Sequence, residues 1–365
     1  MSQSCPPRLL DTVAELDAGW LSAVLREAGH ADADVRGFAV RPIGAGNVSD
    51  TVQVELDFAG PTGAPSSVVC KFRCSEPQAH AHGVGSGSYF REVHSYRAIR
   101  EMGGGACRVP HAYWIAGGAE NVNLVLEDLT GRARSGDQVA GCSATDAAAV
   151  VTQLARLHRA TFPITREEAP AWGLTMAGSA HYWSAAIDRA IPVIRQHSGA
   201  DLSEAEWTVL FGAREVAHDW YSLPMPRGAL THGDPRVDNI LFNDRPDAVE
   251  AVIIDWQMTG WRNPMHDIGY FLSGSISIDD RRAHERVLLA LYADVLGRER
   301  GYADAVIEQD YRVQLLSGLM TTVAAYALLP MSPPLERLLI ALLRRNLAAA
   351  ADWDSIAAVH AITAA

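Results

Sequence analysis

The sequence predicts an α+β protein built from two lobes, because its apolar pattern changes along the chain. The first third is rich in segments where apolar and polar residues alternate, which is typical of strands with one buried face. From about residue 144 onward, apolar residues recur at helical spacing. A chain of 365 residues is long enough for two such lobes. We expect residues 1–130 to form a β-rich lobe and residues 131–365 a mainly helical one.

The first lobe is expected to begin with a helix and to contain a small sheet. Residues 11–29 predict an amphipathic helix that Gly29 ends. Residues 75–88 are polar and rich in glycine, and they predict a mobile loop. The other predicted elements are a hairpin over 36–58, a third strand over 66–74, a helix over 88–103 and two strands within 111–129.

The second lobe is expected to be a helical array with one strand-containing segment. The predicted helices are 144–160, 181–197, 203–219, 281–297, 304–326 and 334–352. Two short apolar runs, NILF and AVIIDW, predict a pair of strands within residues 226–257.

Composition limits the possible partners. The net charge of −12 argues against non-specific binding to nucleic acid, which needs a basic face. We expect no membrane span, since no apolar run approaches the roughly 18 residues that one needs. The N-terminal segment lacks the basic start of a signal peptide, so we expect a cytoplasmic protein. The five cysteines (Cys5, Cys70, Cys74, Cys107 and Cys142) are scattered, which favours free thiols over a metal site.

The densest group of polar residues lies in LTHGDPRVDNILFN, residues 230–243. Asp234 and Asn239 stand between apolar runs, and a second apolar run ends in Asp255. Taken singly, such residues are common turn formers. Together, Asn239 and Asp255 offer the oxygen ligands that Mg²⁺ prefers. Asp234 is then left to accept a proton from an attacking hydroxyl, an arrangement that suits phosphoryl transfer.

The motif HGD-x-x-x-x-N, followed by a strand that ends in Asp, resembles the catalytic and metal loops of kinase-like small-molecule phosphotransferases. That superfamily includes aminoglycoside and macrolide phosphotransferases, choline kinases and ecdysteroid-kinase-like proteins. The phrases HGDPRVDNILF and IIDWQMTGWRNPMHDIGYF look most like the ecdysteroid-kinase-like branch. The resemblance implies a bilobal protein-kinase-like fold, with ATP and Mg²⁺ as cofactors.

The resemblance also implies roles for residues of the first lobe. Lys71, on the predicted third strand, would pair with the α- and β-phosphates of ATP, and Glu92 on the next helix would hold it. The backbone of the turn IGAGNVSDTV would cover the phosphates. In LVLEDL, the Glu127 carbonyl and the Leu129 N–H would face adenine. The turn residues implied are Gly44, Gly46 and Ser49.

In the second lobe, the resemblance implies that Asp234 is the base and that Asn239 and Asp255 hold the metal. Arg236 would lie near the transferred phosphate. His232 and Asp267 would give structural support, with Asp267 bracing the catalytic loop.

The expected function is the ATP-dependent transfer of a phosphate to a hydroxyl of a small molecule, such as an antibiotic-like or steroid-like compound. An aminoglycoside-type or choline-type kinase is an alternative, and the first of these would imply antibiotic resistance. A non-catalytic nucleotide-binding protein is a second alternative. A protein kinase is disfavoured because only residues 256–266 separate Asp255 from Asp267, too few for an activation loop.

Overall fold

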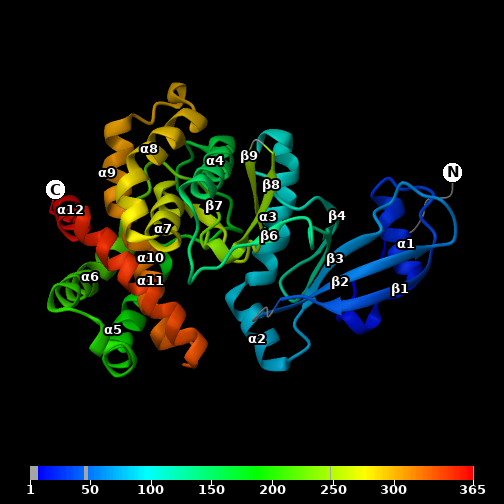
Figure 1. Cartoon of the computed structure of the whole chain (residues 1–365), viewed down its shortest axis with the longest axis horizontal. Helices are drawn as coiled ribbons and strands as arrows, with labels where there is room; N and C mark the ends of the chain where they lie inside the picture. The colour runs from blue at the N-terminus through cyan, green and yellow to red at the C-terminus, as the bar shows by residue number, and fades with distance from the viewer. Residues whose placement is uncertain (1–6, 45–47, 247, 365) are drawn as a thin grey trace. The chain divides into compact units, whose positions relative to one another are not determined.

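The computed structural model describes residues 7–44, 48–246 and 248–364 and confirms the predicted α+β class. The chain divides into two compact units. The first contains residues 1–103, 109–132 and 255–258, and the second contains 104–108, 133–254 and 259–365. Figure 1 shows the strands β1–β3 in the first unit and the helices α5–α12 in the second.

A single boundary between residues 130 and 131 does not describe two short segments. One precedes this boundary but belongs to the second unit, and the other follows it but belongs to the first. Residues 104–108 join the second unit, where the Arg108 carbonyl accepts a hydrogen bond from the Ile253 N–H. Residues 255–258 join the first unit, where the Gln257 carbonyl accepts from Arg91 Nε at 2.6 Å. The single boundary fails there because segments distant in sequence pair with each other.

The first unit holds an antiparallel sheet, five-stranded over the described residues, in the order β1-β2-β3-β5-β4. The predicted hairpin and strands are confirmed. The strands are β1 (Val35–Pro42), β2 (Ser49–Phe58), β3 (Ser67–Arg73), β4 (Ala112–Gly117) and β5 (Val122–Glu127). Helix α1 (Ala18–Glu27) covers one face, and its residues Trp20, Leu21 and Val24 share a core with Val54 and Phe72.

Helix α1 begins later than predicted. A short 3₁₀ turn, η1 (Val13–Glu15), precedes it, and Asp17 forms its N-cap by accepting a hydrogen bond from the Trp20 N–H at 2.7 Å. A cap of this kind starts a helix regardless of apolar residues before it. The prediction of a helix over 11–29 was therefore wrong for residues 11–17.

The predicted loop at 75–88 was wrong, because it contains helix α2 (Pro77–Ser86). The Glu76 carboxylate accepts from the Ala79 N–H at 2.6 Å, and Pro77 occupies a first-turn position that suits proline. Gly87, with φ of 70°, ends α2 and directly precedes α3 (Ser88–Met102), which confirms the predicted helix at 88–103.

The second unit is mainly helical, as predicted. Its helices are α4 (Ala144–Thr161), α5 (Ala180–His197), α6 (Glu204–Ser222), α7 (Met265–Ser275), α8 (Ile278–Leu296), α9 (Asp304–Gln314), α10 (Leu316–Leu328), α11 (Pro333–Asp352) and α12 (Ser355–Thr363). Its strands are β6 (Arg134–Ser135), β7 (Ala229–Thr231), β8 (Ile240–Arg245), β9 (Ala248–Ile253) and β10 (Gly260–Arg262). Antiparallel β8 and β9 confirm the predicted strand pair.

Three features of the second unit differ from the prediction. Helix α7 was missed because every residue in it is buried, which leaves no polar face to give a period. The short helix α12 was also missed. The helix predicted over 304–326 is broken at Leu315, beside the point where Gly269 of α7 packs against the Gln314 carbonyl.

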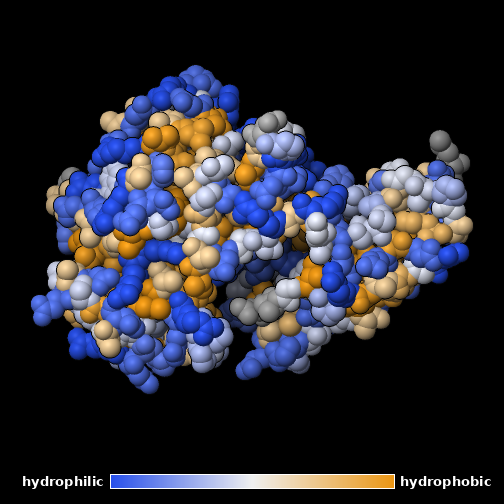
Figure 2. Space-filling model, viewed as in Figure 1, coloured by the Kyte–Doolittle hydropathy of each residue, from blue (hydrophilic) through white to orange (hydrophobic). Residues whose placement is uncertain are grey.

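The apolar core of the helical region is formed by α5, α6, α10, α11 and α12. On the face seen in Figure 2, hydrophilic residues cover most of these helices, with scattered apolar spots between them. No helix in the described ranges is long and apolar enough to cross a bilayer. Cys70, Cys74, Cys107 and Cys142 are free thiols, as expected, and Cys5 lies outside the described residues.

Candidate active site

Lys71, Glu92 and Asp255 form a charged cluster in the first unit, in which Lys71 and Glu92 are buried and Asp255 is partly exposed. The Lys71 ammonium on β3 donates to Glu92 Oε1 on α3 at 2.6 Å and to Asp255 Oδ1 at 3.3 Å. Lys71 is 9% exposed and Glu92 is 1% exposed. Buried charges persist only when they are paired, so the three side chains depend on one another.

The electrostatics of this cluster keep the lysine charged. Burial acts to lower the pKa of Lys71, but the carboxylates of Asp255 and Glu92 outweigh it and raise that pKa above its usual value. Burial raises the pKa of Glu92, against the opposing effect of the Lys71 charge. Lys71 therefore presents a fixed positive charge, the group needed to hold a phosphate.

Asp255 adopts a backbone conformation that is rare for a residue with a side chain. Its φ is 64°, in the left-handed region, which Asp and Asn visit more readily than most residues. It follows Ile254, whose N–H donates to the Asn239 carbonyl at 3.0 Å. Such backbone outliers concentrate at functional sites.

The turn between β1 and β2 is described only in part. Gly44 has a φ of 74°, a conformation that favours glycine. Ser49 starts β2 and is buried, and its hydroxyl has no hydrogen-bond partner among the described residues. Gly46 lies outside the described residues.

The residues expected to face adenine lie at the end of β5 and just after it. Glu127 is the last residue of that strand, and its N–H donates to the His111 carbonyl at 2.7 Å. Asp128 accepts hydrogen bonds from Gln53 Nε2 at 2.6 Å and from the Thr130 N–H at 2.8 Å. These bonds fix the backbone around Leu129, which is 6% exposed.

The loop between β7 and β8, in the second unit, holds Asp234. The Asp267 carboxylate on α7 accepts from the His232 N–H at 2.7 Å and from the Gly233 N–H at 2.9 Å. His232 Nε2 lies 2.9 Å from the Ile254 carbonyl, and its Nδ1 accepts from the Asp234 N–H at 3.3 Å. Asp267 and His232 thus fix the backbone just before and at Asp234.

Asp267 is fully buried and has a further partner, His158, besides the two backbone N–H groups. His158 on α4 places Nε2 3.2 Å from Asp267 Oδ2, and its Nδ1 lies 3.0 Å from the Tyr292 hydroxyl. Burial acts to raise the pKa of Asp267, yet hydrogen bonding to His158 and the neighbouring imidazoles lower it to about 2. Asp267 is therefore ionised when it braces the loop.

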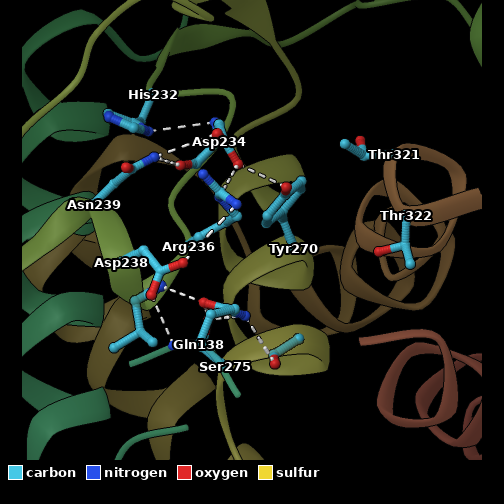
Figure 3. A network of polar contacts seen from close by, with 12 residues as sticks. Gln138, His232, Asp234, Arg236, Asp238, Asn239, Tyr270, Ser275, Thr321 and Thr322 are labelled. Atoms are coloured by element: carbon cyan, nitrogen blue, oxygen red, sulfur yellow. Dashed lines mark hydrogen bonds and ion pairs between the residues drawn. The ribbon is translucent and has the colours of Figure 1, made fainter. Parts of the chain in front are cut away.

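The Asp234 carboxylate has donors on both oxygens, as Figure 3 shows. Oδ1 accepts from the Tyr270 hydroxyl at 2.6 Å and lies 3.3 Å from Arg236 Nε. Oδ2 lies 3.3 Å from Asn239 Nδ2. The carboxylate side chain is 23% exposed, so it remains accessible while its orientation is fixed.

Asn239 is oriented by Asp234. Its amide nitrogen donates to the Asp234 carbonyl at 2.9 Å, in addition to the longer contact with Oδ2. Both contacts use the amide nitrogen and neither uses the amide oxygen, which is the acceptor atom of the side chain. Asn239 is 6% exposed, at the end of the 3₁₀ turn η5 (Val237–Asn239).

Three supporting residues escaped the sequence analysis. Gln138 accepts from the Val237 N–H at 2.7 Å and donates to the Gly274 carbonyl at 3.0 Å, which ties the loop to α7 (Figure 3). Tyr270 and His158 are the others. Tyr270 lies within the phrase IIDWQMTGWRNPMHDIGYF, three residues after Asp267 and so one helical turn on, but the resemblance gave it no role.

Comparison with known proteins gives the family. A model described as the phosphotransferase enzyme family matches residues 39–303, well over half of the chain. The chain belongs to this family. A search of curated proteins gives no match.

Solved structures of phosphotransferases share the fold. A microcompartment-associated aminopropanol kinase is 15% identical, with a TM-score of 0.53 over 87% of this chain and 93% of the other. The ethanolamine kinase of Plasmodium vivax is 10% identical, with a TM-score of 0.50 over 86% and 83%. These similarities confirm the predicted protein-kinase-like fold.

Proposed function

We propose that the protein is an ATP-dependent O-phosphotransferase that moves the γ-phosphate to a hydroxyl of a small molecule. One observation carries the proposal most strongly. Lys71, Glu92 and Asp255 come from three distant parts of the sequence and meet within 3.3 Å. A buried lysine held charged by two carboxylates suits phosphate binding better than a purely structural role, since burial of such a cluster costs stability.

This cluster leads to a proposed role for each residue that binds ATP. Lys71 binds the α- and β-phosphates, and Glu92 keeps its ammonium in place. The backbone at Gly44, Gly46 and Ser49 lies over the phosphates, and the Glu127 carbonyl and the Leu129 N–H bind adenine. The well-fixed backbone around Asp128 supports the adenine role.

Asn239 and Asp255 are the proposed ligands of Mg²⁺. They supply one amide oxygen and one carboxylate, the kind and number of protein ligands that Mg²⁺ takes when phosphates and water complete its shell. The orientation of the Asn239 amide, with its nitrogen bound to Asp234, fits this role. Bound there, the metal would neutralise charge on the phosphates.

Asp234 is the proposed base. It accepts the proton of the acceptor hydroxyl as the hydroxyl oxygen attacks the γ-phosphorus, and the bond between that phosphorus and the bridging oxygen to ADP breaks. Arg236, close to Asp234, is placed to offset charge on the transferred group. Asp267 and His232 hold the loop still, which matters because phosphoryl transfer depends on positioning.

An acceptor screen tests the proposal. The protein is incubated with magnesium ATP and panels of amino alcohols, aminoglycosides, macrolides, steroids and sugars, and ADP release and product mass are measured. Amino alcohols come first, because the relatives of known structure are kinases of aminopropanol and ethanolamine. We expect one panel to give ADP together with a phosphorylated product.

The control is the same screen with the Asp255→Ala variant, which should give neither signal. ATP binding without product in any panel would favour a non-catalytic nucleotide-binding protein. Turnover that survives both Asp255→Ala and removal of Mg²⁺ would contradict the metal assignment.

A further inference from the structure

Tyr270 makes the shortest contact of the Asp234 side chain. Its hydroxyl lies 2.6 Å from Asp234 Oδ1, within the range of a charge-assisted hydrogen bond. Figure 3 shows the ring rising from α7 toward the carboxylate, with Thr321 and Thr322 of α10 on the far side of the tyrosine. Burial raises the pKa of Tyr270 well above its usual value, so the phenol donates.

The contacts differ between the two carboxylate oxygens. Among the described residues, Oδ1 accepts the short hydrogen bond from the Tyr270 hydroxyl and forms an ion pair with Arg236, whose Nε lies 3.3 Å away. Oδ2 has one longer contact, with Asn239 Nδ2 at 3.3 Å. A carboxylate oxygen accepts about two hydrogen bonds. Oδ1 is thus held by a short hydrogen bond with a cation close by, and Oδ2, with its single longer contact, retains more room for a proton.

Buried tyrosines commonly find a polar partner for packing reasons alone, and this chain has several. Tyr326, for example, places its hydroxyl 2.8 Å from Ser198 Oγ, between α10 and α5. Tyr270 differs in its partner, because Asp234 is a partly exposed carboxylate on a loop and not a neighbour in the helical core.

From this geometry we infer that Tyr270 is a positioning residue for the transfer step. Its hydroxyl fixes Oδ1, which turns Oδ2 toward the incoming hydroxyl group. In the step, the acceptor O–H bond breaks and its proton goes to Oδ2. The oxygen forms a bond to the γ-phosphorus, and ADP leaves with the electrons of the broken P–O bond. The inference rests on the proposed function, in which Asp234 is the base.

A double-mutant cycle tests the role. Turnover is measured as release of inorganic phosphate from magnesium ATP, with water as the acceptor, in the wild type, Tyr270→Phe, Asp234→Asn and the double variant. Tyr270→Phe is expected to lower kcat about 10-fold or more, the effect of one hydrogen bond to a charged group, with KM for ATP unchanged. In the Asp234→Asn background, the same change should alter kcat by less than about 2-fold, since the two residues act as a unit.

Tyr326→Phe is the matched control, because it removes a buried phenol hydroxyl far from Asp234 in the sequence and should leave kcat unchanged. Tyr270→Gln is the second variant, since its amide can donate to Oδ1, and it should turn over faster than Tyr270→Phe. An equal loss from Tyr270→Phe in both backgrounds would mean that Tyr270 acts only through packing. Turnover by Asp234→Asn at the wild-type rate would overturn the proposed function itself. Failure of the Tyr270 inference and failure of the proposed function therefore give different results.

Discussion

At the scale of single residues, the loop around Asp234 is held by buried polar side chains from α7, from α4 and from the loop that contains Gln138. The Asp267 carboxylate accepts hydrogen bonds from two backbone N–H groups, and the His158 imidazole hydrogen bonds with that carboxylate. The Gln138 amide oxygen accepts from the Val237 N–H. The resemblance to phosphotransferase motifs predicted Asp234, Asn239 and Asp267 as a group. It could not predict His158 or Gln138, because a contact across more than 90 residues leaves no local pattern.

His266 lies beside the same loop and should make stability depend on pH. Burial and the nearby charge of Arg262 lower the pKa of His266 to about 3, against the opposing effects of Asp267 and of the polar groups of Gln314 and Gly233. In the unfolded chain a histidine titrates near 6.5, so the unfolded state binds more protons below that pH. The stability that neutral His266 contributes is therefore complete above pH 6.5 and is lost as pH falls toward 3.

We expect the free energy of unfolding of the wild type to decrease as the pH is lowered from 7 to 5. This one histidine contributes a decrease of up to about 1.4 kcal/mol per pH unit. Urea unfolding at several pH values measures the slope. His266→Gln should flatten it, while His360→Gln, which removes an exposed imidazole on α12, should keep it. An unchanged slope in His266→Gln would show that the histidine is not buried in its neutral form.

At the scale of elements, α2 shows where local sequence misleads. Its two interior glycines suggested a loop, yet capping by Glu76 and packing of Gly83 against Tyr89 form a helix. Helix α7 escaped detection for the opposite reason, because it is buried on all sides. The amphipathic helices and alternating strands were predictable since each has one polar face.

The glycines of α2 offer a matched pair of substitutions. A Cβ on Gly85 would meet nothing within 4 Å, so Gly85→Ala should raise the free energy of unfolding by about 0.5–1 kcal/mol through helix propensity. A Cβ on Gly83 would come within 2.6 Å of the Tyr89 ring. Gly83→Ala should therefore destabilise the protein by about 1–3 kcal/mol, the usual cost of overpacking.

Chemical denaturation of both variants measures these effects. A stabilised Gly83→Ala would mean that α2 does not pack on Tyr89. A destabilised Gly85→Ala would mean that residues 77–86 are not helical in solution.

At the scale of the whole molecule, the change from strand to helix patterns and the order of the motifs predicted the fold class. The membership of residues 104–108 and 255–258 could not be predicted from the sequence, because each segment groups with its unit through contacts between residues distant along the chain. The second of these segments carries Asp255, so the proposed metal ligand belongs to the same unit as Lys71.

The central claim is that phosphate passes from ATP to a hydroxyl with Asp234 as the base. Phosphorus NMR of the wild type with magnesium ATP and the acceptor found by the screen tests it most directly. We predict that the γ-phosphate signal of ATP is replaced by that of a phosphate monoester. Asp234→Asn should slow this about 10²–10⁴-fold while ATP still binds. Monoester formation at the wild-type rate by Asp234→Asn would contradict the account.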